Sequence, residues 1–172
     1  SKKKAIILST GMSHLGEVEK TIGWINKIWA TDKQSINDMS THQPVEPLTL
    51  LHCVSNYPAR AEDVNLNAIK TMEVAFGVPV GYSDHTMGTE VAIAAVAIGA
   101  RVIEKHLTLD RDMEGSDHKA SLEPNELKTM VNAIRTIEKA MGDGIKRASK
   151  SEFETMNIAR RSLVAARDLK NG

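Results

Sequence analysis

The stretch PVGYSDHTMG, residues 79–88, changes character halfway along its length. Its first residues are apolar and end a strand at Tyr82, and four polar residues, Ser83 to Thr86, then follow in a row. Gly88 and a long alanine-rich apolar run come next, and they predict a helix over 86–100. A strand followed at once by a helix is one βα unit, so these polar side chains lie where the strand ends.

The same alternation recurs along the whole chain. Apolar runs predict strands at 5–8, 48–54, 78–82 and 101–104, each followed by a segment with helical spacing. The order βαβαβαβα predicts parallel strands, either in an open doubly wound sheet or in part of a (β/α)8 barrel. No Gly-rich dinucleotide fingerprint follows any strand, which disfavours a Rossmann sheet. The predicted helices begin near Ser13, Asp63, Thr86 and Ser121, and the second is expected to bury Leu66, Ile69 and Val74.

Two segments interrupt this rhythm. Residues 31–47 are polar and aperiodic and contain two prolines, which predicts a long loop or an insertion. Residues 145–172 suggest a short helix near 152–159 and then a strand-like run at 160–166. The chain therefore divides into an α/β part at 1–145 and a different tail at 146–172.

Length and charge bound the function classes. The chain has 172 residues, enough for one domain with a core, and its 22 basic side chains balance 22 acidic ones. A neutral balance disfavours nucleic acid or an anionic membrane as the main partner. The sequence has no secretory pattern, no run that could span a bilayer and a single cysteine, Cys53, so a cytoplasmic protein is expected.

Polar residues gather at the carboxyl ends of the predicted strands. The connections that follow the helices, such as 76–77 and 98–100, are instead small or apolar. In parallel α/β folds the active site lies at the carboxyl ends of the strands, so this asymmetry indicates a site. The residues concerned are Ser9, Thr10, Ser55, Asn56, Tyr57, Ser83, Asp84, His85, Lys105 and His106.

Two of these residues, His85 and His106, follow strands that are adjacent in sequence. Neighbouring strands lie ~4.8 Å apart, so the two imidazoles can reach one metal ion, although a histidine at a strand end is also commonly structural. The absence of a cysteine cluster and of an HExxH motif argues against a structural zinc site. Two imidazoles completed by oxygen ligands suit Mn²⁺, with Mg²⁺, Co²⁺ or Fe²⁺ as alternatives.

Several motifs together resemble the N-acetylneuraminate (sialic acid) synthase family. They extend from residue 5 to the end of the chain, interrupted by 31–47. The motifs are ILSTGM (7–12), LHCVSNYPA (51–59), VNLNAIKTM (64–72), VPVGYSDHTMG (78–88), ARVIEKHLTLDR (100–111), GSDHKASLEP (115–124) and RRSLVAARDL (160–169).

The resemblance implies a (β/α)8 (TIM) barrel followed by a small antifreeze-like domain. The family condenses phosphoenolpyruvate with an N-acetylated aminosugar, typically N-acetylmannosamine, and releases phosphate. Its divalent metal, usually Mn²⁺, lies between two histidines that correspond to His85 and His106. The resemblance places Ser83, and similarly Ser9, at the phosphate of phosphoenolpyruvate.

The resemblance also implies contacts with the sugar. Tyr57 and either Ser55 or Asn56 correspond to substrate-binding positions, and Asp117 corresponds to a residue that holds the sugar. Asp117 and Tyr57 are therefore the candidate catalytic residues. Many relatives have proline where Ser116 stands, which predicts a less rigid loop in this chain.

The family's enzymes are longer than this chain and act as homodimers. The chain is expected to be the second half of the barrel at 1–145, with the linker and the start of the antifreeze-like domain at 146–172. Two alternatives are a non-catalytic fragment or assembly module, and another metal-dependent TIM-barrel aldolase, which would release no phosphate. Because the family draws other site residues from segments outside this chain, little or no activity is expected of the chain alone.

Overall fold

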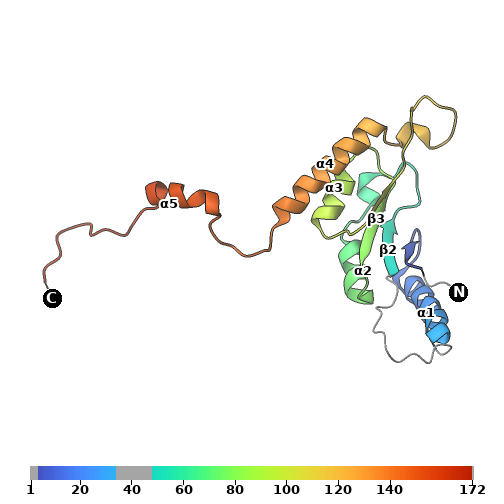
Figure 1. The fold of residues 1–172 in the computed structure, drawn as a ribbon, viewed down its shortest axis with the longest axis horizontal. Coiled ribbons are helices and arrows are strands. Elements are labelled where there is room, and N and C mark those ends of the chain that lie inside the picture. Colours follow the sequence, from blue (N-terminus) through green and yellow to red (C-terminus); the bar gives the residue numbers. More distant parts are fainter. Residues whose placement is uncertain (1–3, 34–47, 172) are drawn as a thin grey trace. The chain divides into compact units, whose positions relative to one another are not determined.

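The computed structural model describes residues 4–33 and 48–171, and the side chains of 4–29 and 48–171 (Figure 1). The chain forms two compact units, Ser1–Met141 and Gly142–Gly172, which are described here one at a time. None of the helices in these ranges is both long enough and apolar enough to cross a bilayer.

The first unit is built on one parallel sheet of four strands. The strands are β1 (Ile6–Ser9), β2 (Leu48–Cys53), β3 (Val80–Asp84) and β4 (Ile103–Lys105), in the spatial order β1-β2-β3-β4. A doubly wound sheet reverses its strand order at a switch point, whereas successive strands of a (β/α)8 barrel lie side by side in sequence order. The observed order therefore decides between the two predicted architectures in favour of a half-barrel.

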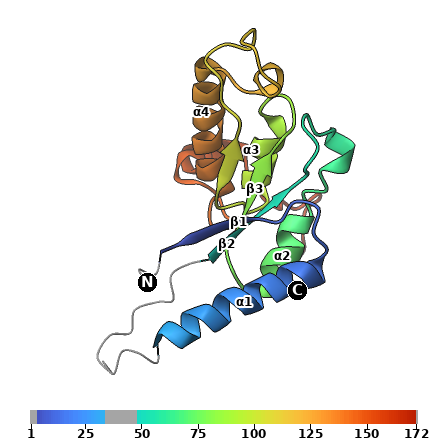
Figure 2. The same cartoon turned by 90° about the vertical axis from the view of Figure 1, so that its right-hand side faces the viewer.

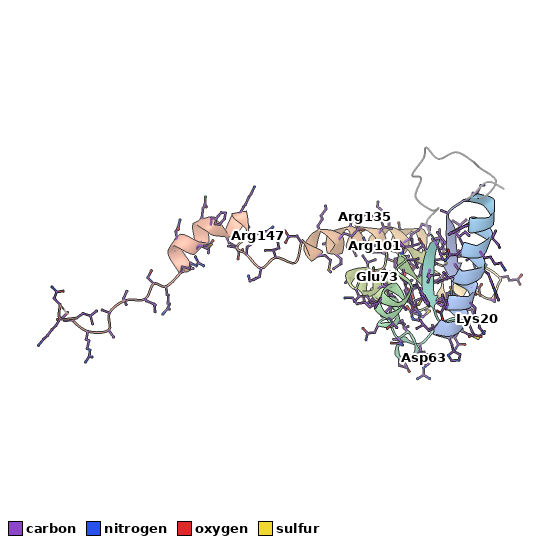
Figure 3. All side chains as sticks on the ribbon, turned by 90° about the horizontal axis from the view of Figure 1, so that it is seen from below. Lys20, Asp63, Glu73, Arg101, Arg135 and Arg147 are labelled. Atoms are coloured by element: carbon purple, nitrogen blue, oxygen red, sulfur yellow. The ribbon has the colours of Figure 1, made fainter. Side chains whose placement is uncertain are left out.

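Four helices accompany the strands. They are α1 (Leu15–Lys33), α2 (Ala68–Phe76), α3 (Glu90–Ala97) and α4 (Pro124–Met141). In Figure 2, α1 and α2 lie below the strands, and α3 and α4 lie next to β3. The charged residues labelled in Figure 3, Lys20 on α1, Glu73 on α2 and Arg135 on α4, are exposed, as expected for helices that bury only one face.

The core lies between the helices and one face of the sheet. Leu50, Val80 and Tyr82 project from this helix-facing side and are at most 1% exposed. They pack in one cluster with residues of α1, α2 and α3, while a second cluster joins α3 to α4 and includes Ile103 of β4. All four helices thus cover the same face. The partners in the two clusters include Val18, Ile69, Met72, Ala92, Ala95, Met130 and Ile134.

The opposite face of the sheet, here called the inner face, is closely packed in its middle. Gly81 of β3 lies there, and a Cβ at this position would come within 2.4 Å of the carbonyl oxygen of Val102 and 2.6 Å of a methyl group of Leu51. Only glycine leaves room for both neighbours. Leu51 is completely buried as a result, whereas Ile7 at the β1 edge is 58% exposed.

The structure corrects several element boundaries. The third helix was predicted over 86–100 but spans Glu90–Ala97, because the preceding residues form a loop in which Thr86 is bridged to Ala59. The second helix begins at Ala68, after the short turn η1 (Ala61–Asp63), and ends at Gly77, whose left-handed φ of 63° lets its N–H reach Glu73.

Two further predictions also change. Val74 was expected in the core but is 86% exposed, because it follows the buried Ile69 by five residues and so lies about 140° away around the helix. Of the predicted loop at 31–47, residues 31–33 belong to α1, and 34–47 lie outside the described residues.

The second unit contains a short turn, η3 (Lys150–Glu152), and the helix α5 (Phe153–Ala159). Ser149 and Glu152 form a capping box at the start of η3, and α5 follows η3 directly. The strand predicted at 160–166 is wrong, because these residues are exposed and have no regular structure. A strand needs a neighbour to pair with, and the described part of this unit, residues 142–171, contains none.

Candidate functional site

Side chains alternate between the two faces of each strand, and the register places those of the inner face in layers. Cys53 pairs with Ser83, and Ser83 with Glu104, so these three residues form the upper layer of the inner face. Ser83 is 2% exposed, and its Oγ donates a hydrogen bond of 2.6 Å to Oε1 of Glu104. A serine hydroxyl and a carboxylate therefore meet in the upper layer, next to the carboxyl ends of the strands.

His85 and His106 follow two residues after Ser83 and Glu104, above this layer and on the same face. Their ring centroids are 5.3 Å apart, and the ring planes are nearly perpendicular at 85°. Nδ1 of His85 lies 2.7 Å from the carbonyl oxygen of Val54. Since a carbonyl only accepts, Nδ1 carries the proton, and Nε2 of His85 keeps its lone pair for a ligand.

Tyr57 packs against both histidines. Its ring is stacked on His106 at a centroid distance of 4.2 Å and meets His85 edge-on at 5.4 Å. Its hydroxyl lies 3.1 Å from Oγ of Ser121 and donates to the carbonyl oxygen of Asp117 at 3.2 Å. The three rings form one aromatic cluster. The segment after β4 contacts this cluster through the hydroxyl of Tyr57.

Asp117 reaches the cluster from that loop. Its Oδ2 lies 3.8 Å from Nδ1 of His106, and the two side chains are 54% and 36% exposed. Ser121 fixes the Asp117 carbonyl with a hydrogen bond of 2.7 Å. Arg111 in turn donates from Nε to the carbonyl of Ser121 at 3.0 Å and pairs with Glu126, which raises the pKa of Arg111 and lowers the pKa of Glu126.

Asp84 and Lys105 lie behind the histidines, on the helix-facing side. Nζ of Lys105 is 2.8 Å from Oδ2 of Asp84, and both side chains are almost completely buried. Oδ1 of Asp84 accepts from the backbone N–H and the hydroxyl of Thr86. Thr86 was expected as a helix cap, but it bonds to Asp84 and the helix begins at Glu90.

The remaining predicted site residues are placed less centrally. Ser9 is exposed at the end of β1, level with Leu51 and one layer below Ser83. Ser55 and Asn56 are exposed in the loop after β2, and Oγ of Ser55 lies 3.2 Å from where a Cβ on Gly11 would stand. The structure thus brings together His85, His106, Tyr57 and Asp117, with Ser83 beneath them.

The donor set fits a divalent metal ion. Within the described residues no group of three or more His, Cys, Asp and Glu side chains could hold one, and the candidate ligands brought together at the strand ends are His85 and His106. The contact between His85 and Val54 is the outer-shell hydrogen bond that metal-ligating histidines typically make. Two imidazoles as ligands would leave the other coordination positions to oxygen ligands from water or substrate.

Sequence reasoning missed Glu104 and Ser121 as members of the site. Glu104 could have been found, because it precedes His106 by two residues on the same strand face. Ser121 carries no such signal, since it follows a loop and was expected only to open the last helix of the first unit. Its role depends on how the loop over 107–120 folds back onto Tyr57.

These features define a class of protein. Four parallel strands in sequence order, with helices on one face and imidazoles and hydroxyls at the carboxyl ends, form half of a (β/α)8 barrel with its active-site edge. A protein-family model described as the NeuB family matches residues 1–146, and the chain belongs to that family.

Individual relatives agree with this assignment. The chain is 54% identical over 169 residues to the N,N'-diacetyllegionaminic acid synthase of Campylobacter jejuni, covering 98% of this chain and 47% of that protein. It is 44% identical over 172 residues to the synthase of the same name from Legionella pneumophila, covering 100% of this chain and 45% of that protein. The chain spans about half the length of these relatives.

Solved structures show the same likeness. The N-acetylneuraminic acid (sialic acid) synthetase of Leptospira borgpetersenii, crystallised with citrate, superimposes with a TM-score of 0.70 at 38% identity. The match covers 92% of this chain and 51% of the other. The half-barrel of the first unit therefore matches the barrel of a NeuB-type structure.

Proposed function

We propose that this chain carries the metal-binding and part of the substrate-binding site of a nonulosonic acid synthase. The reaction condenses phosphoenolpyruvate with an N-acetylated aminosugar and releases phosphate. One observation carries the proposal, namely the facing pair of His85 and His106 at the carboxyl ends of neighbouring strands. Membership of the NeuB family supports it.

The chemistry requires two substrates to meet in one orientation. Carbon 3 of phosphoenolpyruvate bonds to the aldehyde carbon of the open-chain sugar, water adds at carbon 2, and phosphate leaves with its bridging oxygen. A divalent metal, most simply Mn²⁺, would be held by His85 and His106 and would polarise the aldehyde as a Lewis acid. The protein's contribution is then positioning and electrostatics.

Residues below and beside the histidines have roles that fit this chemistry. Ser83 and Ser9 lie on the inner face below the histidines, where their hydroxyls can donate to the phosphate or carboxylate of phosphoenolpyruvate. Asp117 is half exposed beside His106, where a carboxylate can accept from sugar hydroxyls. Tyr57 would form one wall of the sugar site, and its hydroxyl is already used within the protein.

The loop after β2 extends the same site. Ser55 and Asn56 are exposed there, within the same short segment as Tyr57. We assign both to substrate contact, and either Ser55 or Asn56 takes the substrate-binding position next to Tyr57 that the family resemblance implies. The names of the two bacterial relatives, both diacetyllegionaminic acid synthases, support a sugar that bears acetamido groups.

Metal binding is the direct test. The chain, titrated with Mn²⁺ by isothermal calorimetry, should bind one ion, and His85→Ala or His106→Ala should abolish the signal. His14→Ala is the matched control, because it removes an exposed imidazole just before α1 that is not part of the ring cluster of Tyr57, His85 and His106. Unchanged Mn²⁺ affinity in both site variants would overturn the proposal.

A second assay separates the reaction classes. A protein spanning the relatives' full length and carrying this chain should release phosphate from phosphoenolpyruvate only when an N-acetylated aminosugar and Mn²⁺ are present. Turnover of pyruvate with no phosphate release would instead identify a metal-dependent aldolase. Binding of Mn²⁺ without either reaction would leave a non-catalytic module as the description of the protein.

A further inference from the structure

The carboxyl ends of β3 and β4 are joined by a buried ion pair. Asp84 and Lys105 are partners in the strand register, and their side chains are 0% and 3% exposed. Nζ of Lys105 lies 2.8 Å from Oδ2 of Asp84. Charged side chains are seldom fully buried, and a buried ion pair often adds little to stability. The presence of this pair therefore calls for a functional explanation.

The ion pair binds the residues on either side of His85. Besides Asp84, Lys105 donates to the carbonyl oxygen of Thr86. Asp84 in turn accepts from the N–H of Thr86 at 2.9 Å and from its hydroxyl at 2.8 Å. One ammonium group therefore binds the residues on both sides of His85.

The same ammonium group belongs to the residue directly before His106. Because successive side chains of a strand point to opposite faces, Asp84 and Lys105 face the helices while His85 and His106 face the inner side. The ion pair thus links the two backbone segments that carry the imidazoles. The side chains of Asp84 and Lys105 themselves do not reach the inner face.

We propose that Asp84 and Lys105 are positioning residues that set the separation and mutual angle of His85 and His106. This inference rests on the proposed role of the two histidines in holding a divalent cation. Metal-ligating histidines depend on outer-shell groups that fix their orientation, and here the backbone is held as well as the ring.

The energetics favour positioning over stability as the reason for the charges. Replacing a buried ion pair by apolar residues is often neutral or stabilising, whereas removing one partner is costly. A neutral pair could fill the space between β3 and the helices, but it would lack the ammonium group that binds both the Thr86 carbonyl and the side chain of residue 84. The directional bonds of the ammonium group are what a neutral pair lacks.

The test compares variants of the full chain. Asp84→Asn/Lys105→Met removes both charges, keeps an acceptor for Thr86 and has nearly the same shape. Thr86→Val is a milder variant that removes only one hydrogen bond to Asp84. Met72→Ala, in the core on α2, is the control for a loss of stability without any contact with the pair.

Three readouts separate positioning from folding. Thermal unfolding gives stability, calorimetry gives the Mn²⁺ dissociation constant, and nitrogen-15 NMR of the metal-free chain reports whether Nδ1–H of His85 stays bound to Val54. We expect the double variant to fold, to lose the protected Nδ1–H signal and to bind Mn²⁺ about 10- to 100-fold more weakly. Thr86→Val should change both site readouts in the same direction, and Met72→Ala should change stability alone.

Opposite outcomes are equally clear. A folded double variant with an unchanged His85 signal and unchanged Mn²⁺ affinity overturns the inference. If the double variant does not fold, the Thr86→Val variant decides. An unchanged His85 signal and unchanged Mn²⁺ affinity in Thr86→Val would then overturn the inference. If the unmodified chain binds no Mn²⁺, the proposed function fails, while the metal-free NMR signal still decides whether the pair positions the ring.

Discussion

Oγ of Ser83 donates its proton to Oε1 of Glu104 at 2.6 Å, directly below the two histidines. A hydroxyl that donates to a carboxylate cannot donate the same proton to a phosphate. In the proposed function, Ser83 therefore has to release Glu104 before it can donate to phosphoenolpyruvate. The carboxylate itself also repels a phosphate in the same layer.

This relationship predicts opposite effects for the two partners. Glu104→Gln should tighten binding of phosphoenolpyruvate in the presence of Mn²⁺, because it removes a negative charge and leaves Ser83 a weaker, neutral acceptor to release. Ser83→Ala should weaken binding by about 1.5–3 kcal/mol, the usual value of a hydrogen bond to a charged group. Calorimetric titration with phosphoenolpyruvate measures both, and weaker binding by Glu104→Gln would show that the carboxylate supports the ligand.

Ser121 is predicted to hold Tyr57 and the loop that carries Asp117. In Ser121→Ala, the Tyr57 hydroxyl keeps only the Asp117 carbonyl at 3.2 Å, and that carbonyl loses its bond of 2.7 Å from Ser121. We expect faster amide hydrogen exchange over 107–120 and weaker sugar binding, with exchange in α2 unchanged. Unchanged exchange in the loop would show that Arg111 and Glu126 suffice to hold it.

Cys53 is predicted to be an unreactive thiol at neutral pH. Burial raises its pKa, the negative charge of Glu104 acts in the same direction, and a backbone hydrogen bond from Gly11 opposes them only in part. The reaction with a disulfide reagent should be slow and should accelerate only above the pH at which ordinary thiols ionise. Fast labelling near pH 7 would show that the inner face opens in solution.

The raised pKa of Cys53 also predicts how the stability of the chain depends on pH. A pKa that is raised in the folded state contributes stability below the pKa of the unfolded thiol, and this contribution is lost as pH rises through the folded value. Cys53→Ser should therefore flatten the alkaline fall in the free energy of unfolding. An alkaline profile identical to that of the unmodified chain would assign the fall to other groups.

The alternation of strands and helices, and the sheet edge at which polar residues gather, were predictable because both follow from local pattern. Apolar runs ending in polar residues placed His85 and His106 at one edge, and the structure brings their rings to 5.3 Å. Parallel strands of neighbouring βα units leave little freedom at that edge. The choice between a doubly wound sheet and a barrel needed the spatial strand order, which periodicity does not contain.

The errors have separate physical causes. Thr86 has the chemistry of a helix cap, but the buried carboxylate of Asp84 takes both its N–H and its hydroxyl. Val74 was grouped with Ile69, yet a spacing of five residues places the two on different faces of α2. A run such as 160–166 is typical of a strand, but it forms one only beside a partner strand.

Tyr82 gives a prediction about stability that the sequence could not supply. Its side chain is completely buried on the helix-facing side of β3, and within the described residues its hydroxyl has no hydrogen-bond partner. Burial raises the pKa of this phenol well above its ordinary value, and the negative charge of Asp84 and the closeness of that carboxylate to the hydroxyl act in the same direction, although the contact lacks the geometry of a hydrogen bond. The hydroxyl thus stays protonated and carries the cost of leaving water.

Tyr82→Phe should therefore stabilise the chain, because it removes a polar group that is buried without a bond. The ring would keep its contact with His52, whose centroid is 5.9 Å away. We expect a gain of about 1 kcal/mol in the free energy of unfolding by urea, with the slope of the transition unchanged. Tyr57→Phe is the matched control and should destabilise, since the Tyr57 hydroxyl contacts both Ser121 and Asp117. A loss of stability in Tyr82→Phe would mean that the hydroxyl has a partner in solution, such as a buried water, and equal losses in the two variants would assign both hydroxyls the same bonded role.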